Sequence, residues 1–174
     1  MILGLDISTT CVGIAIVDES ESIVVSEAVK LSSKDSLEKR AFQIQQRIAD
    51  LADQYNIERV FVEAPLISSV NQKTVALLQR FHGMVSYGVF DLLGKEPALI
   101  GSSTARKLIG IKLPRTKGKD TKRIVIDFIE ERYKNTKTPF TYNLTPKGNF
   151  QPTTDDRADA IVVALAGPLL NKKS

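Results

Sequence analysis

The sequence contains very few of the residues that build disulfides and zinc sites. Among its 174 residues there are one cysteine, Cys11, one histidine, His82, and no tryptophan. A single cysteine cannot form an intramolecular disulfide, so we expect a reducing compartment such as the cytoplasm. One cysteine and one histidine are also too few for a zinc site, which is usually built from three or four such ligands.

Long apolar runs are absent as well. No stretch approaches the roughly 20 apolar residues that a bilayer-spanning helix needs. The opening MILGLDISTT has neither the basic flank nor the long apolar run of a signal peptide. We therefore expect no association with a membrane. The length fits one compact core, which predicts a single domain over 1–174.

Positive charge is in modest excess and is unevenly placed. The formal net charge is +4, and the segment 105–123 is dense in lysine and arginine but holds one acid. Such a run suits a polyanion such as nucleic acid, and it also suits a solvated loop without a partner. Three aromatic residues within 140–150 are flanked by lysines. They either stack on unpaired bases or pack locally.

The pattern of apolar residues predicts strands followed by alternating helices and strands. Three strand-like runs over 1–31 suggest an antiparallel meander, and Asp35 with Glu38 predicts a capping box at the start of a helix. This order fits an α/β fold, with a mixed sheet and helices on both of its faces. The later elements predicted are a helix over 37–55, a strand over 59–65, a helix over 71–93, a strand over 97–101, a short helix near 105–109, a helix over 121–133, an irregular segment over 136–154 and a closing helix over 155–170.

Four carboxylates stand where apolar residues are expected. Asp6 and Glu63 each end an apolar strand, and Asp156 and Asp159 open a helix that is otherwise nearly all apolar. Burying an unpaired carboxylate costs several kcal/mol, so each acid needs a partner or a metal ion. Asp156 and Asp159 are three residues apart and share one helix face. If the two strands are neighbours, a helix packed across their ends completes a cluster of four acids.

Such a cluster predicts a site for divalent cations. Neighbouring carboxylates repel one another and resist ionisation unless a cation neutralises them. Ligation by oxygen alone suits Mg²⁺ or Mn²⁺. Two such ions about 3.5–4 Å apart would clamp a scissile phosphate and activate water. The expected chemistry is therefore hydrolysis of a phosphodiester.

Each acid also has a structural interpretation. Asp6 would cap the STT turn by accepting backbone N–H groups, and Glu63 would pair with a basic residue at the sheet edge. Asp155 and Asp156 suit the positive end of a helix dipole, which is the interpretation we adopt for Asp155. His82 lies on an apolar helix face, where a histidine is usually a core residue rather than a ligand.

These motifs resemble those of a known family. The opening ILGLDISTTCVGIAIVD resembles the start of RuvC-type Holliday junction resolvases, in which an aspartate ends the first strand and a turn of small residues follows. FVEAP resembles their second acidic strand, and DDRADAIVVALA resembles their closing D-x-x-D-A motif. The likeness extends over most of the chain, with the motifs in the family's order.

The resemblance implies an RNase H-like fold, with a mixed five-stranded sheet flanked by helices on both faces. It implies a homodimer that places paired symmetric nicks across a four-way DNA junction, and Mg²⁺ or Mn²⁺ bound by Asp6, Glu63, Asp156 and Asp159. Family members carry basic residues before the final helix, and STARKLIG and KGKDTKRIV are similar to that region. The candidate DNA contacts are Arg106, Lys107, Lys119 and Lys122. Compact, divergent resolvases occur in bacteriophages, so a phage or viral origin and a host-cytoplasmic location are expected.

Other functions remain open at this point. Actin-like ATPases also open with a strand, an aspartate and a threonine-rich turn, although that fold normally needs two related lobes and this length holds one. A structure-specific DNA-binding protein without catalysis would carry the same basic segment. An RNase H activity on RNA–DNA hybrids would use the same acids.

Overall fold

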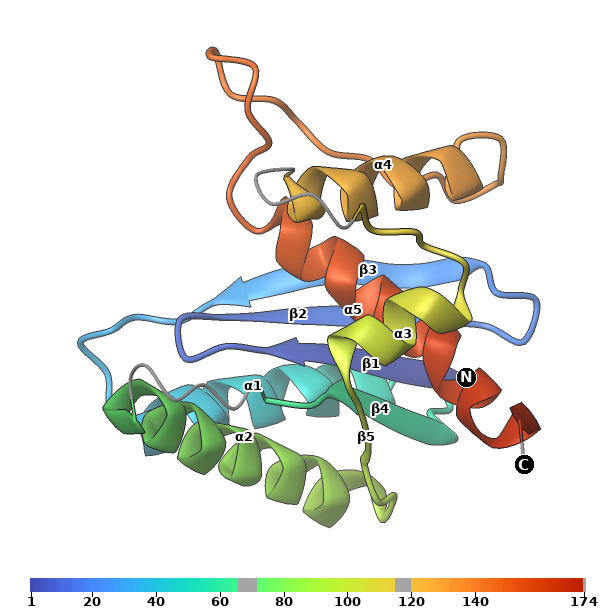
Figure 1. Ribbon diagram of the computed structural model, residues 1–174. Helices are drawn as coiled ribbons and strands as arrows, with labels where there is room; N and C mark the ends of the chain where they lie inside the picture. The colour runs from blue at the N-terminus through green and yellow to red at the C-terminus, as the bar shows by residue number, and fades with distance from the viewer. Residues whose placement is uncertain (66–71, 115–119, 174) are drawn as a thin grey trace.

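The computed structural model describes residues 1–65, 72–114 and 120–173. Five strands form one sheet in the order β3-β2-β1-β4-β5 (Figure 1). The first three pair antiparallel as a meander, whereas β4 is parallel to β1 and β5 is parallel to β4. The predicted five-stranded mixed sheet is confirmed. Its strands are β1 (Ile2–Ile7), β2 (Cys11–Val17), β3 (Ile23–Lys30), β4 (Arg59–Glu63) and β5 (Ala98–Ile100).

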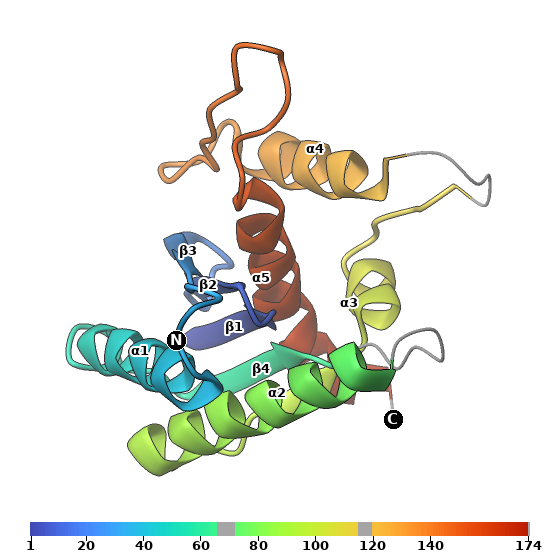
Figure 2. The same cartoon turned by 90° about the vertical axis from the view of Figure 1, so that its left-hand side faces the viewer.

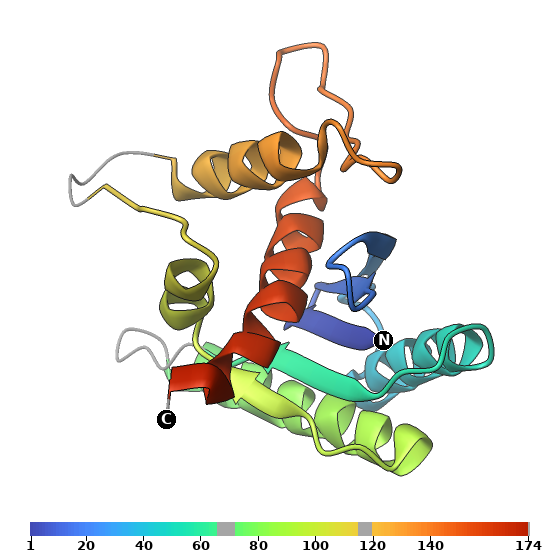
Figure 3. The same ribbon diagram turned by 90° about the vertical axis from the view of Figure 1, so that its right-hand side faces the viewer.

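Helices cover both faces of this sheet, as predicted. Two of them, α1 (Leu37–Ala52) and α2 (Gln72–Leu93), lie side by side on one face (Figure 2). On the other face α5 (Thr154–Ala166) crosses the strands, with α3 (Ser102–Leu108) and α4 (Thr121–Tyr133) beside it (Figure 3). A short 3₁₀ helix, Gly167–Lys173, follows α5. No helix within the described ranges combines the length and apolar composition that crossing a bilayer requires.

The alternation of side chains along β1 divides the core into two layers. Leu3 and Leu5 are fully buried and pack toward α1 and α2, in a cluster that includes Ile44 and Phe81. The intervening residues face α5, because successive side chains of a strand point to opposite faces. Asp6 has the same place in this alternation as Gly4, so its side chain points to the α5 side.

The start of α1 differs from the prediction by one residue. Ser36, and not Asp35, is the N-cap, and its side chain accepts a hydrogen bond from the Lys39 amide at 3.2 Å. Asp35 instead forms an ion pair with the Lys39 side chain at 2.7 Å. Serine and aspartate are almost equally good N-caps, so sequence preference alone does not decide between adjacent candidates.

Two glycines allow α5 to lie directly on the sheet. A Cβ added to Gly4 would stand 2.4 Å from the backbone oxygen of Ala160, and one added to Gly13 would stand 2.0 Å from that of Asp156. Glycine within a strand is typical where another backbone approaches closely. Gly13 is the register partner of Asp6, so the first turn of α5 is held beside that acid.

Candidate active site

The two strand acids lie at the same edge of the sheet. β1 and β4 are parallel neighbours, and Leu5 is paired with Val62. The next residue of each strand is the acid, so Asp6 and Glu63 follow side by side. Both side chains are partly buried. The sequence alone did not establish that the strands carrying these acids are adjacent. In the structure they are.

The first turn of α5 brings the other two acids to this edge. Asp156 lies over Gly13, and Asp159 follows one turn later on the same helix. Burial, followed by the charges of Glu63, Asp159 and Asp156 in that order, raises the pKa of the Asp6 carboxyl to about 8. The structure therefore brings all four predicted acids close enough to repel one another.

The other three carboxyls are perturbed in the same direction. Burial and the charge of Asp159 raise the pKa of Glu63 to about 7. Burial is also the main cause of the raised pKa values of Asp156 and Asp159. A group of carboxyls that all hold protons above their ordinary range has too much negative charge for its surroundings. It is an arrangement that favours a cation.

Positive side chains reach the acids from the neighbouring helices. Arg106 of α3 donates from Nη2 to Asp159 Oδ1 at 3.0 Å, and Lys122 of α4 forms an ion pair with Asp155. Lys107 is exposed on α3. Lys119 lies outside the described residues. Of the four candidate DNA contacts, Arg106 and Lys122 therefore lie at the acid edge.

Asp155 is more than a dipole partner for α5. Its carboxylate binds Lys122, and its charge contributes to the raised pKa values of Asp6 and Asp156.

The interpretation of Asp6 as a cap of the STT turn fails. Within the described residues, the turn after β1 is closed by Ser8, whose amide and hydroxyl donate to the Cys11 carbonyl at 2.9 and 2.8 Å.

Three residues lie next to the acids although the sequence did not predict them to be near the site. Cys11 lies beside Asp156 and Ser102 beside Glu63, and each lowers the pKa of the carboxyl next to it. His82 is 5% exposed and donates from Nε2 to the Glu63 carbonyl at 3.0 Å, which fixes the end of β4. Burial lowers the pKa of His82, which favours the neutral ring. The interpretation of His82 as a core residue is confirmed, and its partner is the main chain of a candidate site residue.

The donor set is suited to a hard divalent cation. Four carboxylates supply oxygen ligands only, which Mg²⁺ and Mn²⁺ prefer. Among the described residues, no group of three or more His, Cys, Asp or Glu side chains already has the arrangement of a metal site. Asp159 is instead hydrogen-bonded to Arg106. The residues fit the ion by their chemistry, and their side chains would have to turn to hold it.

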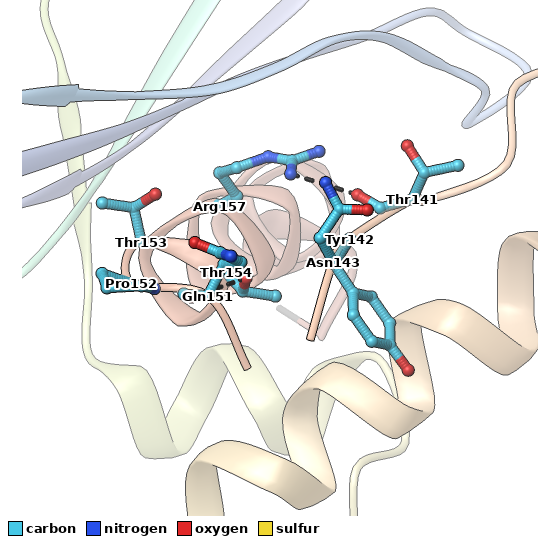
Figure 4. A pocket seen from close by; sticks show the side chains of 8 residues that line it. All are labelled: Thr141, Tyr142, Asn143, Gln151, Pro152, Thr153, Thr154 and Arg157. Carbon is cyan, nitrogen blue, oxygen red and sulfur yellow. Dashed lines mark hydrogen bonds between the residues drawn. The ribbon is translucent and has the colours of Figure 1, made fainter. Parts of the chain in front are cut away.

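A separate polar cavity lies beside the start of α5. It has a volume of about 310 Å³ and is lined by Thr141–Asn143, Gln151–Thr154 and Arg157 (Figure 4). Arg157 donates to the backbone oxygens of Ser26 and Thr141, so the helix is tied both to β3 and to the segment before it. None of the four candidate acids lines this cavity.

The irregular segment before α5 uses its aromatic residues for packing. Tyr142 and Phe150 meet edge to face with ring centroids 5.0 Å apart, and Phe140 is 5% exposed. Arg123 and Arg157 stand over Phe150 and Phe140, at 5.2 and 5.0 Å from the ring centroids. Of the two interpretations of these rings, the structure favours local packing over stacking on bases.

The comparison with solved structures identifies relatives of the fold. No protein-family model matches the sequence, and no curated protein sequence matches it. The structure of Thermus thermophilus RuvC in complex with a Holliday junction substrate is similar, with a TM-score of 0.72 at 17% identity over 99% of this chain and 95% of that one. A second structure of Thermus thermophilus RuvC has a TM-score of 0.61 at 19% identity over the same shares.

The likeness extends to a eukaryotic protein. The yeast mitochondrial Holliday junction resolvase has a TM-score of 0.55 at 14% identity, over 94% of this chain and 75% of that one. These matches cover nearly the whole chain and do not favour the actin-like alternative. The predicted fold is confirmed: this chain has the RNase H-like α/β fold of the RuvC-type Holliday junction resolvases.

Proposed function

We propose that this chain is a divalent-cation-dependent endonuclease that cuts branched DNA, above all four-way junctions. The observation that carries the proposal is the convergence of Asp6, Glu63, Asp156 and Asp159 at one sheet edge, with pKa values raised by burial and mutual repulsion. Support for the substrate comes from the fold, which is shared with a RuvC structure solved with a Holliday junction.

The four acids would hold Mg²⁺ or Mn²⁺. When bound, two such ions supply Lewis-acid stabilisation of the phosphate and activation of water. The chain supplies the rigid frame, since Asp6 and Glu63 stand on adjacent strands and Asp156 and Asp159 on a helix seated against glycine. Sites on regular elements are held more firmly than sites on loops.

Basic residues beside the acids would position the DNA backbone. Lys122 is 70% exposed at the start of α4, and Lys107 is exposed on α3. Arg106, Lys107, Lys119 and Lys122 remain the proposed DNA contacts. Contacts of this kind neutralise phosphates and release counterions, so binding should weaken steeply as the salt concentration rises.

A cleavage assay on defined substrates tests this function. Purified protein is incubated with labelled four-way junctions, flaps, duplexes and RNA–DNA hybrids, with and without Mn²⁺ or Mg²⁺, and the cuts are mapped. We expect cation-dependent nicks at symmetric positions of the junction. Cutting of hybrids alone would assign an RNase H activity. Junction binding without cutting would assign a DNA-binding protein, and thermal stabilisation by nucleotides would revive the ATPase alternative.

We further propose that the protein acts as a homodimer, because two symmetric nicks require two active sites. A candidate interface is the outer surface of α1 and α2. Phe42 is 58% exposed and Tyr87 is 68% exposed, and both line a cavity of about 320 Å³ between these helices. Exposed aromatic patches of this kind are typical of protein–protein interfaces.

Substitution of Phe42 tests the interface. Phe42→Glu would bury a charge in the contact, so the dimer should dissociate to monomers at micromolar concentration, as measured by light scattering coupled to size exclusion. Leu144→Glu is the matched control, because Leu144 is 53% exposed on the segment before α5, away from α1 and α2. A dimer that survives Phe42→Glu would place the interface elsewhere, and a monomeric wild type would contradict the homodimer.

A further inference from the structure

Among the described residues, Arg106 is the most deeply buried positive side chain next to the candidate ion ligands. It reaches from α3 to Asp159, with 3.0 Å between Nη2 and Oδ1. The arginine and aspartate side chains are 20% and 16% exposed, so the pair is largely withdrawn from solvent. A buried ion pair is screened far less than a surface one, and separating its members is costly.

The ion pair at Lys122 is of a different kind. Lys122 is 70% exposed, and it binds Asp155, which is not one of the four candidate ligands. Arg106 instead acts on two of those ligands. It binds Asp159, and its charge opposes the rise in the pKa of Glu63 that burial and Asp159 cause. The guanidinium therefore performs part of the neutralisation that a bound cation would perform.

The guanidinium is also incompletely satisfied where it stands. Its Nε is buried and has no hydrogen-bond partner among the described residues. A buried donor without a partner is energetically unfavourable. Arg106 is thus held at Asp159 by charge, while its remaining hydrogen-bonding capacity favours another position. A side chain held in this way is one that a stronger cation can displace.

We propose that Arg106 is a built-in counter-ion that occupies the cation's place beside Asp159 in the ion-free protein, and that a divalent ion binds there by displacing it. The inference rests on the proposed function, because it takes the four acids as the ion site. Its consequence is a weakened apparent affinity for the ion. When a ligand binds only one conformational state, its apparent affinity is reduced in proportion to the fraction of molecules in that state.

Thermal unfolding in increasing Mn²⁺ or Mg²⁺, without DNA, tests the inference. In Arg106→Gln the ion concentration at half of the maximal rise in Tm should fall on the order of tenfold below the wild-type value, because one competing charge is gone. Arg80→Gln is the matched control. It removes the same charge and also breaks an arginine–glutamate pair, with Glu38, on the opposite face of the sheet. Its ion dependence should equal that of the wild type.

Arg106→Lys keeps the test decisive if the glutamine variant is poorly folded. Lysine retains the charge without the planar fork, so its half-maximal ion concentration should lie between those of the wild type and the glutamine variant. Equal or higher ion requirements in both Arg106 variants would overturn the counter-ion while leaving the nuclease proposal standing. No ion-dependent rise in the Tm of the wild type would overturn both.

Discussion

Replacing Asp6 with asparagine is expected to abolish strand cutting and, at the same time, to stabilise the ion-free protein. Asp6 is the acid on which the charges of Glu63, Asp159, Asp156 and Asp155 all act, so its loss removes the central ligand of the proposed ion site. Cutting should fall by three orders of magnitude or more, as expected for loss of a metal ligand that acts in the transition state. Binding to a four-way junction should persist, because the basic residues are untouched.

The gain in stability follows from the raised pKa. The ordinary Asp value is 3.8, and the folded protein raises the pKa of Asp6 to about 8. The folded state therefore keeps a proton that the unfolded chain releases, and stability is lost as the pH rises from about 4 to about 8. Asparagine cannot ionise and avoids this loss. At pH 8 the variant should be more stable by several kcal/mol, or on the order of 10 °C in Tm, and at pH 4 the difference should vanish.

Thermal unfolding from pH 4 to pH 9 in a chelator, together with cleavage at pH 8 in Mn²⁺, measures both effects. Asp50→Asn is the control, since Asp50 is 66% exposed on α1 and only weakly paired with Arg47 at 3.7 Å. It should leave cutting and the pH profile unchanged. Unimpaired cutting by Asp6→Asn would reject the site. A wild type whose stability does not fall toward pH 8 would show that the acid cluster is not strained.

Gly13→Ala is expected to be the most damaging single-methyl substitution in the sheet. The new Cβ would stand 2.0 Å from the carbonyl oxygen and 2.6 Å from the carbonyl carbon of Asp156. Both atoms belong to the backbone of α5 and cannot rotate away, so the helix must move. Overpacking of this kind costs about 1–3 kcal/mol and occasionally more, and we expect the upper end. Tm should fall by on the order of 10 °C.

The same movement would separate Asp156 from Asp6 and should reduce cutting even in molecules that remain folded. Gly83→Ala is the matched control: Gly83 lies within α2, and an added Cβ meets nothing within 4 Å. Alanine is the better helix former by about 1 kcal/mol, so this variant should be slightly more stable than the wild type. If Gly13→Ala unfolded at the wild-type temperature, α5 would not contact β2 as described.

Much of this architecture is encoded locally. The longer strands and helices follow from hydrophobic periodicity, and the acids at the ends of β1 and β4 stand out because they interrupt apolar runs. The neighbours of the clustered acids are not encoded locally. Cys11, Ser102 and Lys122 come near Asp156, Glu63 and Asp155 only because β2, α3 and α4 pack around α5.

The glycines of β1 and β2 are a signal in the sequence that can be interpreted only once the position of α5 is known. Gly4 and Gly13 interrupt the strand patterns of β1 and β2, and glycine in a strand is typical of close backbone approach. Which backbone approaches depends on contacts more than 140 residues away in the chain, as the contact of Gly13 with Asp156 shows. Periodicity alone carries no such information.

The direct contact of α5 with the main chain of the sheet affects how much the rest of the sequence can change. The gap between the last helix and the strand ends is set by backbone atoms and the small side chains Ala160 and Ala164, so it does not depend on which larger residues fill the rest of the interior. Leucine, isoleucine and valine can be exchanged elsewhere while the carboxylates keep their spacing.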